Sequence, residues 1–118
     1  MQTENSVILA QVINSALVDK KAENIININL TKIENSVSKF FIICTANSKI
    51  HAIALAKHVD DTAREILKEK TWHIEGLENS EWILLDYVDV VVHIFLENTR
   101  KLYRLEQLWG DADFKSIS

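Results

Sequence analysis

Two short apolar runs, Trp82 to Asp86 and Val90 to Leu96, constrain the fold more than any other feature of this sequence. Both are rich in Val, Ile, Leu and Phe, which fit a pleated, buried surface, so both are predicted strands. The short spacing between them favours an antiparallel hairpin. Because side chains alternate along a strand and both faces of the pair are mainly apolar, we expect the sheet to be covered on both sides.

The rest of the chain alternates between helical and strand patterns. In order, the patterns predict a helix at 6–20, strands at 23–30 and 39–45, a helix after residue 48, a strand at 71–75, the hairpin, and a closing helix after residue 97. The sequence therefore predicts an α/β fold in a single domain spanning residues 1–118. Its core is a single mixed sheet of about five strands flanked by helices.

Polar residues predict where the first two helices begin. Asn5 or Ser6 is expected to cap the first helix, and Asn47 or Ser48 the second, because these side chains can accept a hydrogen bond from a free backbone N–H. Ile66 is expected to lie on the buried stripe of the second helix.

The closing helix has its own start and stop signals. Asn98 or Thr99 is expected to cap it, and Gly110 to end it. Between these ends, helical spacing predicts one apolar stripe made of Leu102, Leu105 and Trp109.

Composition narrows the class of partner. Lys and Arg number 13 against 17 Asp and Glu, a net charge of −4. Direct binding to DNA through phosphates is disfavoured by this charge, which suits a basic protein partner better. The single cysteine, Cys44, cannot form a disulfide within the chain. With no signal pattern and no membrane-length apolar run, we expect a cytoplasmic protein.

The residues that could carry chemistry are scattered. The four histidines do not cluster, so we expect no metal site and no cofactor. His93, in an apolar strand, is better explained as a packed, hydrogen-bonded histidine than as a base. Asp86 and Asp89 flank the hairpin connection, where capping the turn is the simplest role. Cys44 is expected to be inert core.

A protein-binding surface is the better prediction. Three helices cannot cover both faces of the sheet completely, and an exposed apolar patch marks an interaction site. Trp82 and Tyr87 are the kind of aromatic anchor that dominates interfaces. A place for Trp82 in the core is the equal alternative.

Several ordered motifs resemble one family. They are W-I-L-L-D-Y-x-D-V-V-V-H from Trp82, R-K-L-Y-R-L-E-Q-L-W from Arg100, the Glu75-Gly76 pair, and F-I-I-C-T from Phe41 followed by Ser48. Together they resemble the ribosomal silencing factor family, also called Iojap-like proteins. The resemblance extends from Asn24 to Trp109.

This resemblance implies a nucleotidyltransferase-like sheet. The sequence has no Gly-Ser turn to hold a phosphate and no clear acid pair to hold magnesium, so no nucleotidyl transfer is expected. The resemblance implies a translation repressor that binds a large-subunit ribosomal protein, bacterial protein number fourteen, at the intersubunit face. Bound there, it would block joining of the small subunit when nutrients are scarce, and the free protein would form a homodimer. By position, the implied partner-binding residues are Trp82, Leu85, Asp86, Tyr87 and Asp89. The residues implied to lock the last helix to the sheet are Arg100, Tyr103, Glu106 and Trp109.

Three positions depart from the family pattern. Lys39 replaces an acidic residue, and Ala46 and Val88 each replace a glycine. Because a β-branched residue is poor at positive φ, Val88 implies either another turn type or a strained turn. Two other functions stay open: a nucleotidyltransferase-like enzyme or nucleotide binder, and a dimeric scaffold module.

Overall fold

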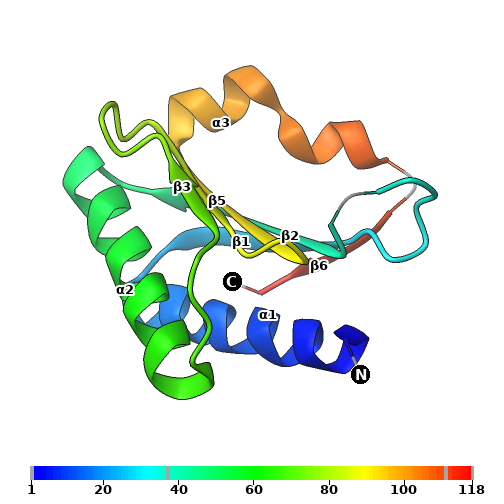
Figure 1. Ribbon diagram of the computed structural model, residues 1–118. Coiled ribbons are helices and arrows are strands. Elements are labelled where there is room, and N and C mark those ends of the chain that lie inside the picture. The colour runs from blue at the N-terminus through cyan, green and yellow to red at the C-terminus, as the bar shows by residue number, and fades with distance from the viewer. Residues whose placement is uncertain (1, 37, 111, 118) are drawn as a thin grey trace.

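The computed structural model describes residues 2–36, 38–110 and 112–117. The elements in chain order are α1 (Gln2–Asp19), β1 (Glu23–Asn29), β2 (Phe40–Ala46), α2 (Lys49–Leu67), β3 (His73–Glu75), β4 (Trp82–Asp86), β5 (Val90–Leu96), α3 (Glu97–Tyr103), the short 3₁₀ helix η1 (Leu105–Trp109) and β6 (Asp113–Ser116). Figure 1 shows their arrangement.

The strands form one six-stranded sheet in the order β3-β4-β5-β2-β1-β6. Among the strands of the described residues, β2 and β5 alone pair in parallel, and the other neighbours are antiparallel. The predicted mixed sheet and the β4–β5 hairpin are therefore confirmed. The sequence analysis missed β6, because its residues are exposed and Phe114 is its one apolar residue, so it carries no alternating signal.

The helices divide unequally between the two faces of the sheet. In Figure 1, α1 and α2 lie on one side of the sheet and α3 lies on the other. The larger apolar cluster joins α1 and α2 to the sheet. The face toward α3 has a smaller buried cluster, made of Ile28, Leu30, Ile43 and Phe95. The helix on this face, α3, has 7 residues, whereas α1 and α2 on the other face have 18 and 19.

The boundaries of the first two helices were predicted with mixed success. The predicted cap at Asn5 or Ser6 is wrong, because α1 already begins at Gln2. The cap at Ser48 is confirmed, since its hydroxyl accepts a hydrogen bond from the His51 backbone N–H at 3.0 Å. The predicted burial of Ile66 is wrong: it is 62% exposed, in the last turn of α2.

The closing segment is not one helix. The chain enters α3 directly from Leu96 without a side-chain cap, so the prediction of Asn98 or Thr99 is wrong. Arg104 has φ +48, which ends α3 and starts η1. The break interrupts the predicted apolar stripe and leaves Leu102 76% exposed. Gly110 directly follows η1, as predicted for the end of the helical segment, with right-handed helical backbone angles.

Candidate functional site

The β4–β5 hairpin presents two different faces. Its register pairs Trp82 with Phe95 and Asp86 with Val91. Trp82 and Asp86 lie on the face toward α3, and both are partly exposed. Leu85 points to the opposite face and is completely buried in the larger cluster. The hairpin therefore joins a solvent-facing side to a fully packed side.

Trp82 is both packed and accessible. Its ring stacks on Phe95 with centroids 4.9 Å apart and meets Tyr103 of α3 at 4.8 Å. Its indole N–H donates to Nδ1 of His93 at 3.1 Å. Trp82 is therefore packed against aromatic neighbours and is still only partly buried, so its contacts with the core leave a role in an interface open.

His93 is the packed, hydrogen-bonded histidine that was predicted. Its residue is 4% exposed, and burial lowers the pKa of its imidazole to about 4. Its Nδ1 accepts the Trp82 N–H, so the neutral ring carries its proton on Nε2. The Nε2 atom has no hydrogen-bond partner among the described residues. His93 thus serves as an acceptor that orients Trp82.

The hairpin connection is a strained turn. The Asp89 N–H donates to the Tyr87 carbonyl at 2.9 Å, two residues back, with Val88 between them at φ +73. This pattern is a γ-turn of positive φ, a rare and strained conformation, and more so for a β-branched residue. The Val88 N–H donates to Asp86 Oδ1 at 2.7 Å, so Asp86 has the predicted turn-capping role.

Asp89 clamps this turn to two other elements. Its backbone carbonyl accepts from the N–H groups of Lys39 and Phe40 at 2.8 and 3.0 Å. Its carboxylate accepts from the Ser6 hydroxyl at 3.2 Å and pairs with Lys39 Nζ at 3.8 Å. Lys39, one of the three departures from the family pattern, therefore supplies a cation for Asp89.

Tyr87 lies with Leu85 on the packed side. It is 7% exposed, and burial together with the nearby Asp60 carboxylate raises the pKa of its phenol. The phenol oxygen has no hydrogen-bond partner in the described part of the chain. Of the five residues predicted to bind a partner, Trp82, Asp86 and Asp89 reach solvent in this structure. Leu85 and Tyr87 support them from the core.

Trp72 is a surface residue that the sequence analysis missed. It is 75% exposed, and its backbone N–H donates to the Asp86 carbonyl at 2.8 Å. Trp72, Asp86, Val88 and Ser38 line an open hollow of about 420 Å³. The available signal was an aromatic residue within the polar run from Lys68 to His73, where no core role explains it.

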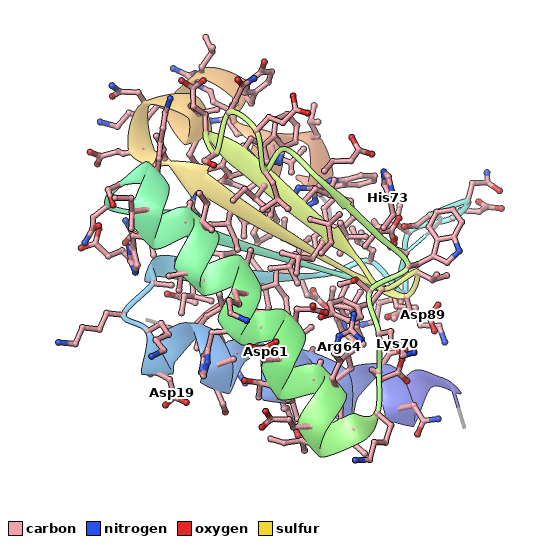
Figure 2. The ribbon with its side chains drawn as sticks, turned by 60° about the vertical axis from the view of Figure 1, so that its left-hand side comes forward. Asp19, Asp61, Arg64, Lys70, His73 and Asp89 are labelled. Atoms are coloured by element: carbon pink, nitrogen blue, oxygen red, sulfur yellow. The ribbon has the colours of Figure 1, made fainter. Side chains whose placement is uncertain are left out.

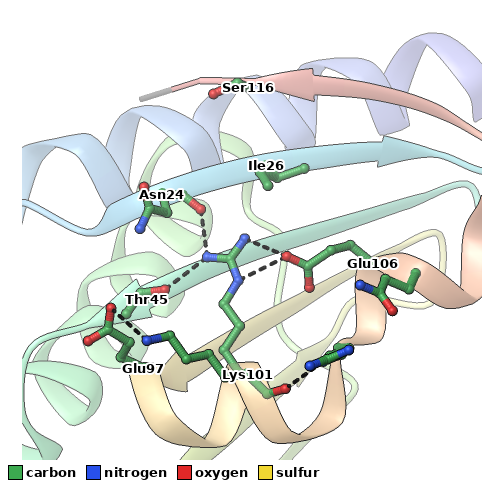
Figure 3. Close-up of a pocket in the computed structure, with 10 residues that line it drawn as sticks. Asn24, Ile26, Thr45, Glu97, Lys101, Glu106 and Ser116 are labelled. Atoms are coloured by element: carbon green, nitrogen blue, oxygen red, sulfur yellow. Dashed lines mark hydrogen bonds and ion pairs between the residues drawn. The ribbon is translucent and has the colours of Figure 1, made fainter.

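A buried arginine locks α3 and η1 to the sheet, as predicted. The Arg100 side chain is 10% exposed and donates to Glu106 Oε2 at 3.0 and 3.2 Å. Its NH1 group also donates to the Asn24 carbonyl at 2.7 Å and the Thr45 hydroxyl at 2.9 Å (Figure 3). These contacts border a hollow of about 480 Å³. The guanidinium is occupied by the protein itself, which makes its role structural.

The other two predicted lock residues make aromatic contacts. Tyr103 meets Trp82, as described above, and Trp109 of η1 contacts Phe41 of β2 edge to face, with centroids 5.8 Å apart. The closing segment, α3 and η1, is therefore held by the hydrogen bonds of Arg100 and by two aromatic contacts.

Groups that could support catalysis are dispersed. Figure 2 shows Asp19, Asp61 and His73 on three different elements, α1, α2 and β3. Within residues 2–36, 38–110 and 112–117, no three His, Cys, Asp or Glu residues are placed to hold a metal ion. Burial raises the pKa of the Cys44 thiol to about 12, so it is not a reactive thiolate. No helix of the described chain has the length and apolar character needed to span a membrane.

Comparison with known proteins gives a consistent result. Residues 3–118 match the family model described as "Ribosomal silencing factor during starvation". The chain is 40% identical over 104 residues to ribosomal silencing factor RsfS of Halalkalibacterium halodurans, covering 88% of this chain and 87% of that protein. It is 37% identical over 115 residues to RsfS of Bacillus subtilis, covering 96% and 94%.

Solved structures agree with the fold. A crystal structure of a protein from Chromobacterium violaceum has a TM-score of 0.82 and 34% sequence identity, and the match covers 86% of this chain and 83% of that one. This agreement extends to a crystal structure of a protein from Bacillus halodurans, with a TM-score of 0.76 and 34% identity over 93% and 96% of the two chains.

Proposed function

Because the chain belongs to the ribosomal silencing factor family, we propose that it binds the large ribosomal subunit and keeps the small subunit from joining, which lowers translation during starvation. The observation that carries this proposal is the match of residues 3–118 to the family model, nearly the whole chain. The proposed contact is the large-subunit protein number fourteen on the intersubunit face.

The proposed binding surface is the open side of the β4–β5 hairpin. Trp82 offers a partly exposed aromatic ring held in one orientation, which is the property of an interface anchor. Asp86 offers a carboxylate at the far end of β4, and Asp89 adds a second, which already pairs with Lys39, in the turn that follows. Leu85 and Tyr87 contribute by packing beneath the hairpin, so that the surface is ordered before binding.

Charge supports this partner class. The chain carries a net charge of −4, and ribosomal proteins that contact RNA are rich in Lys and Arg. Opposite charge accelerates the encounter of two proteins and fixes the register of their contact. The acidic hairpin therefore suits a basic protein surface better than bare phosphate.

The proposed mechanism is mutual exclusion and involves no bond-making step. The factor and the small subunit would compete for one face of the large subunit. The effect then depends on how tightly the factor holds that face relative to the small subunit. The names of the relatives, ribosomal silencing factor, likewise refer to silencing.

Co-sedimentation with isolated large subunits tests the proposal. Wild-type protein is expected to sediment with large subunits and to reduce the yield of joined ribosomes when small subunits are added. Trp82→Ala is expected to weaken both effects by at least about tenfold, because hot-spot aromatic residues contribute about 2 kcal/mol or more. Failure of the wild type to co-sediment at micromolar concentration contradicts the proposal.

The matched control is Ile66→Ala. Ile66 is also a large, exposed apolar residue, but it belongs to the last turn of α2 and is not part of the hairpin. Its variant is expected to bind and silence like wild type. Thermal melts of both variants separate lost contact from lost fold. Unchanged binding of a folded Trp82→Ala protein would remove Trp82 from the proposed surface.

We also propose that the free protein forms a homodimer through surface that overlaps the ribosomal contact. Large apolar side chains are exposed on α3 and η1, namely Leu102, Tyr103 and Leu108, and Tyr103 contacts Trp82. Covering such a patch is a common reason for self-association. Light scattering across a dilution series is expected to show a dimer that large subunits dissociate.

A further inference from the structure

The hollow beside the strained turn has the chemistry of a receptor for a cation. One wall is the indole of Trp72, which is 75% exposed. A second wall is the Val88 side chain, 55% exposed and held outward by a turn with φ +73. The carboxylate of Asp86 lies on a third side. A large apolar residue left this open is a candidate contact site.

Asp86 keeps negative charge available in this hollow. Its Oδ1 accepts the Val88 N–H at 2.7 Å, which fixes the direction of the carboxylate. Among the described residues, none of the ion pairs includes Asp86. Asp89, by contrast, is already engaged by Lys39 and Ser6. Asp86 is therefore the hairpin carboxylate that a partner's cation can pair with.

Two basic groups near the hollow already pair with other carboxylates. Lys39 Nζ lies 3.8 Å from Asp89 Oδ2. His73 lies opposite Asp86 in the β3–β4 register, but its Nε2 is 2.9 Å from Glu75 Oε2. These pairings leave room for a cation from outside the chain.

We propose that this hollow receives an arginine side chain from the basic protein that the chain contacts on the large ribosomal subunit. The inference rests on the function proposed above and names a second contact point within it. A guanidinium can lie flat against the Trp72 indole while its N–H groups reach the Asp86 carboxylate. Arginine fits better than lysine because its planar, weakly hydrated group stacks on aromatic rings.

This contact point is separate from the Trp82 anchor. Trp82 begins β4 and Asp86 ends it, so the two lie at opposite ends of one strand. Two anchors at that separation would fix the orientation of the partner as well as its position. The turn between β4 and β5 is clamped by the bonds of Asp89 to Lys39 and Phe40, so the hollow is formed before binding.

The test is a double-mutant cycle on binding to purified large subunits. Trp72→Leu keeps apolar bulk but removes the π face. Asp86→Asn keeps an oxygen that can accept the Val88 N–H but removes the charge. Each variant is expected to weaken binding by about tenfold, as for a desolvated cation–π contact and a charged hydrogen bond. The double variant is expected to lose less than the product of the two, because both residues would hold one guanidinium.

The salt dependence supplies a second readout. Asp86→Asn is expected to flatten the loss of affinity with rising salt, whereas Ile66→Ala should leave both affinity and salt dependence unchanged. Thermal melts must show that the variants are folded. If the wild type binds and each single variant binds within about twofold of its affinity, this inference is overturned and the proposed function stands. A loss of affinity in the double variant equal to the product of the two single losses would also overturn the inference. If the wild type does not bind large subunits, both proposals are overturned.

Discussion

The indole N–H of Trp82 donates a 3.1 Å hydrogen bond to Nδ1 of His93, across the β4–β5 hairpin. Only a neutral imidazole can accept this bond. Burial, which lowers the pKa of His93 to about 4, keeps the ring neutral near pH 7. The orientation of the exposed part of Trp82 is therefore tied to the protonation state of a residue that solvent barely reaches.

The first prediction is a pH-dependent loss of stability through His93. His93 takes up a proton near pH 6.5 in the unfolded chain but only near pH 4 in the folded chain. Between these two pH values the unfolded state therefore holds more protons than the folded state. Stability should fall as pH drops from about 6.5 to about 4, by up to about 3 kcal/mol from this group. Urea denaturation at a series of pH values measures the slope.

A matched variant isolates the contribution of His93. His93→Gln does not titrate, yet its side-chain oxygen can accept the Trp82 N–H. Its stability is expected to change less between pH 7 and pH 4.5 than that of the wild type. Identical slopes for the two proteins would show that His93 is not the group responsible.

The second prediction concerns the two glycines, which should respond in opposite ways to alanine. A Cβ on Gly76 would lie 2.0 Å from the Trp82 carbonyl oxygen, and its φ is +89. Gly76→Ala should therefore cost at least about 2 kcal/mol, since the loop before β4 must shift. Gly110→Ala meets nothing within 4 Å and should be near neutral. Denaturant midpoints of both variants compare them; equal midpoints would contradict the described loop.

The third prediction is that Arg100 stabilises the closing segment. Arg100→Ala leaves Glu106 half-buried without its cation, so we expect a loss of about 3 kcal/mol. Arg100→Lys should recover only part, because an ammonium has three donors on one nitrogen and cannot reproduce the four bonds of the guanidinium, two of them to Glu106. Lys101→Ala is the control: its pair with Glu97 is exposed, and removing it should cost less than about 1 kcal/mol. Chemical denaturation gives all three values.

The elements that sequence predicted well have a strong periodic signal. Apolar runs rich in Val, Ile, Leu and Phe predicted β4 and β5, and a polar residue before an apolar stripe predicted the Ser48 cap. The break at Arg104 had no such signal, because a positive φ at arginine depends on tertiary contacts of its neighbours. β6 was missed for the reason that edge strands are often weakly patterned.

The sequence predicted which segment carries the candidate site, but not which of its side chains form a common surface with other parts of the chain. Periodicity placed Trp82 and Leu85 on opposite faces, and the buried side of Leu85 follows once α1 and α2 cover that face. Trp72 could not be assigned, because its proximity to Asp86 arises from the pairing of β3 with β4. The separation of two residues along the chain does not predict which of them become neighbours across paired strands.

The last prediction concerns the strain at Val88, which should trade stability for binding. A β-branched side chain at φ +73 costs about 1–3 kcal/mol, and glycine removes that cost while adding about 0.5–1 kcal/mol of unfolded-state entropy. Val88→Gly should therefore be more stable by about 1 kcal/mol. Val88→Ala keeps a Cβ at positive φ and should gain less.

Both variants also remove the apolar wall of the Trp72 hollow, so both should bind large subunits more weakly than wild type. Denaturant unfolding and co-sedimentation measure the two effects on the same preparations. A more stable Val88→Gly protein that binds as tightly as wild type would separate the strain from the binding surface, whereas a less stable one would show that the turn is not strained.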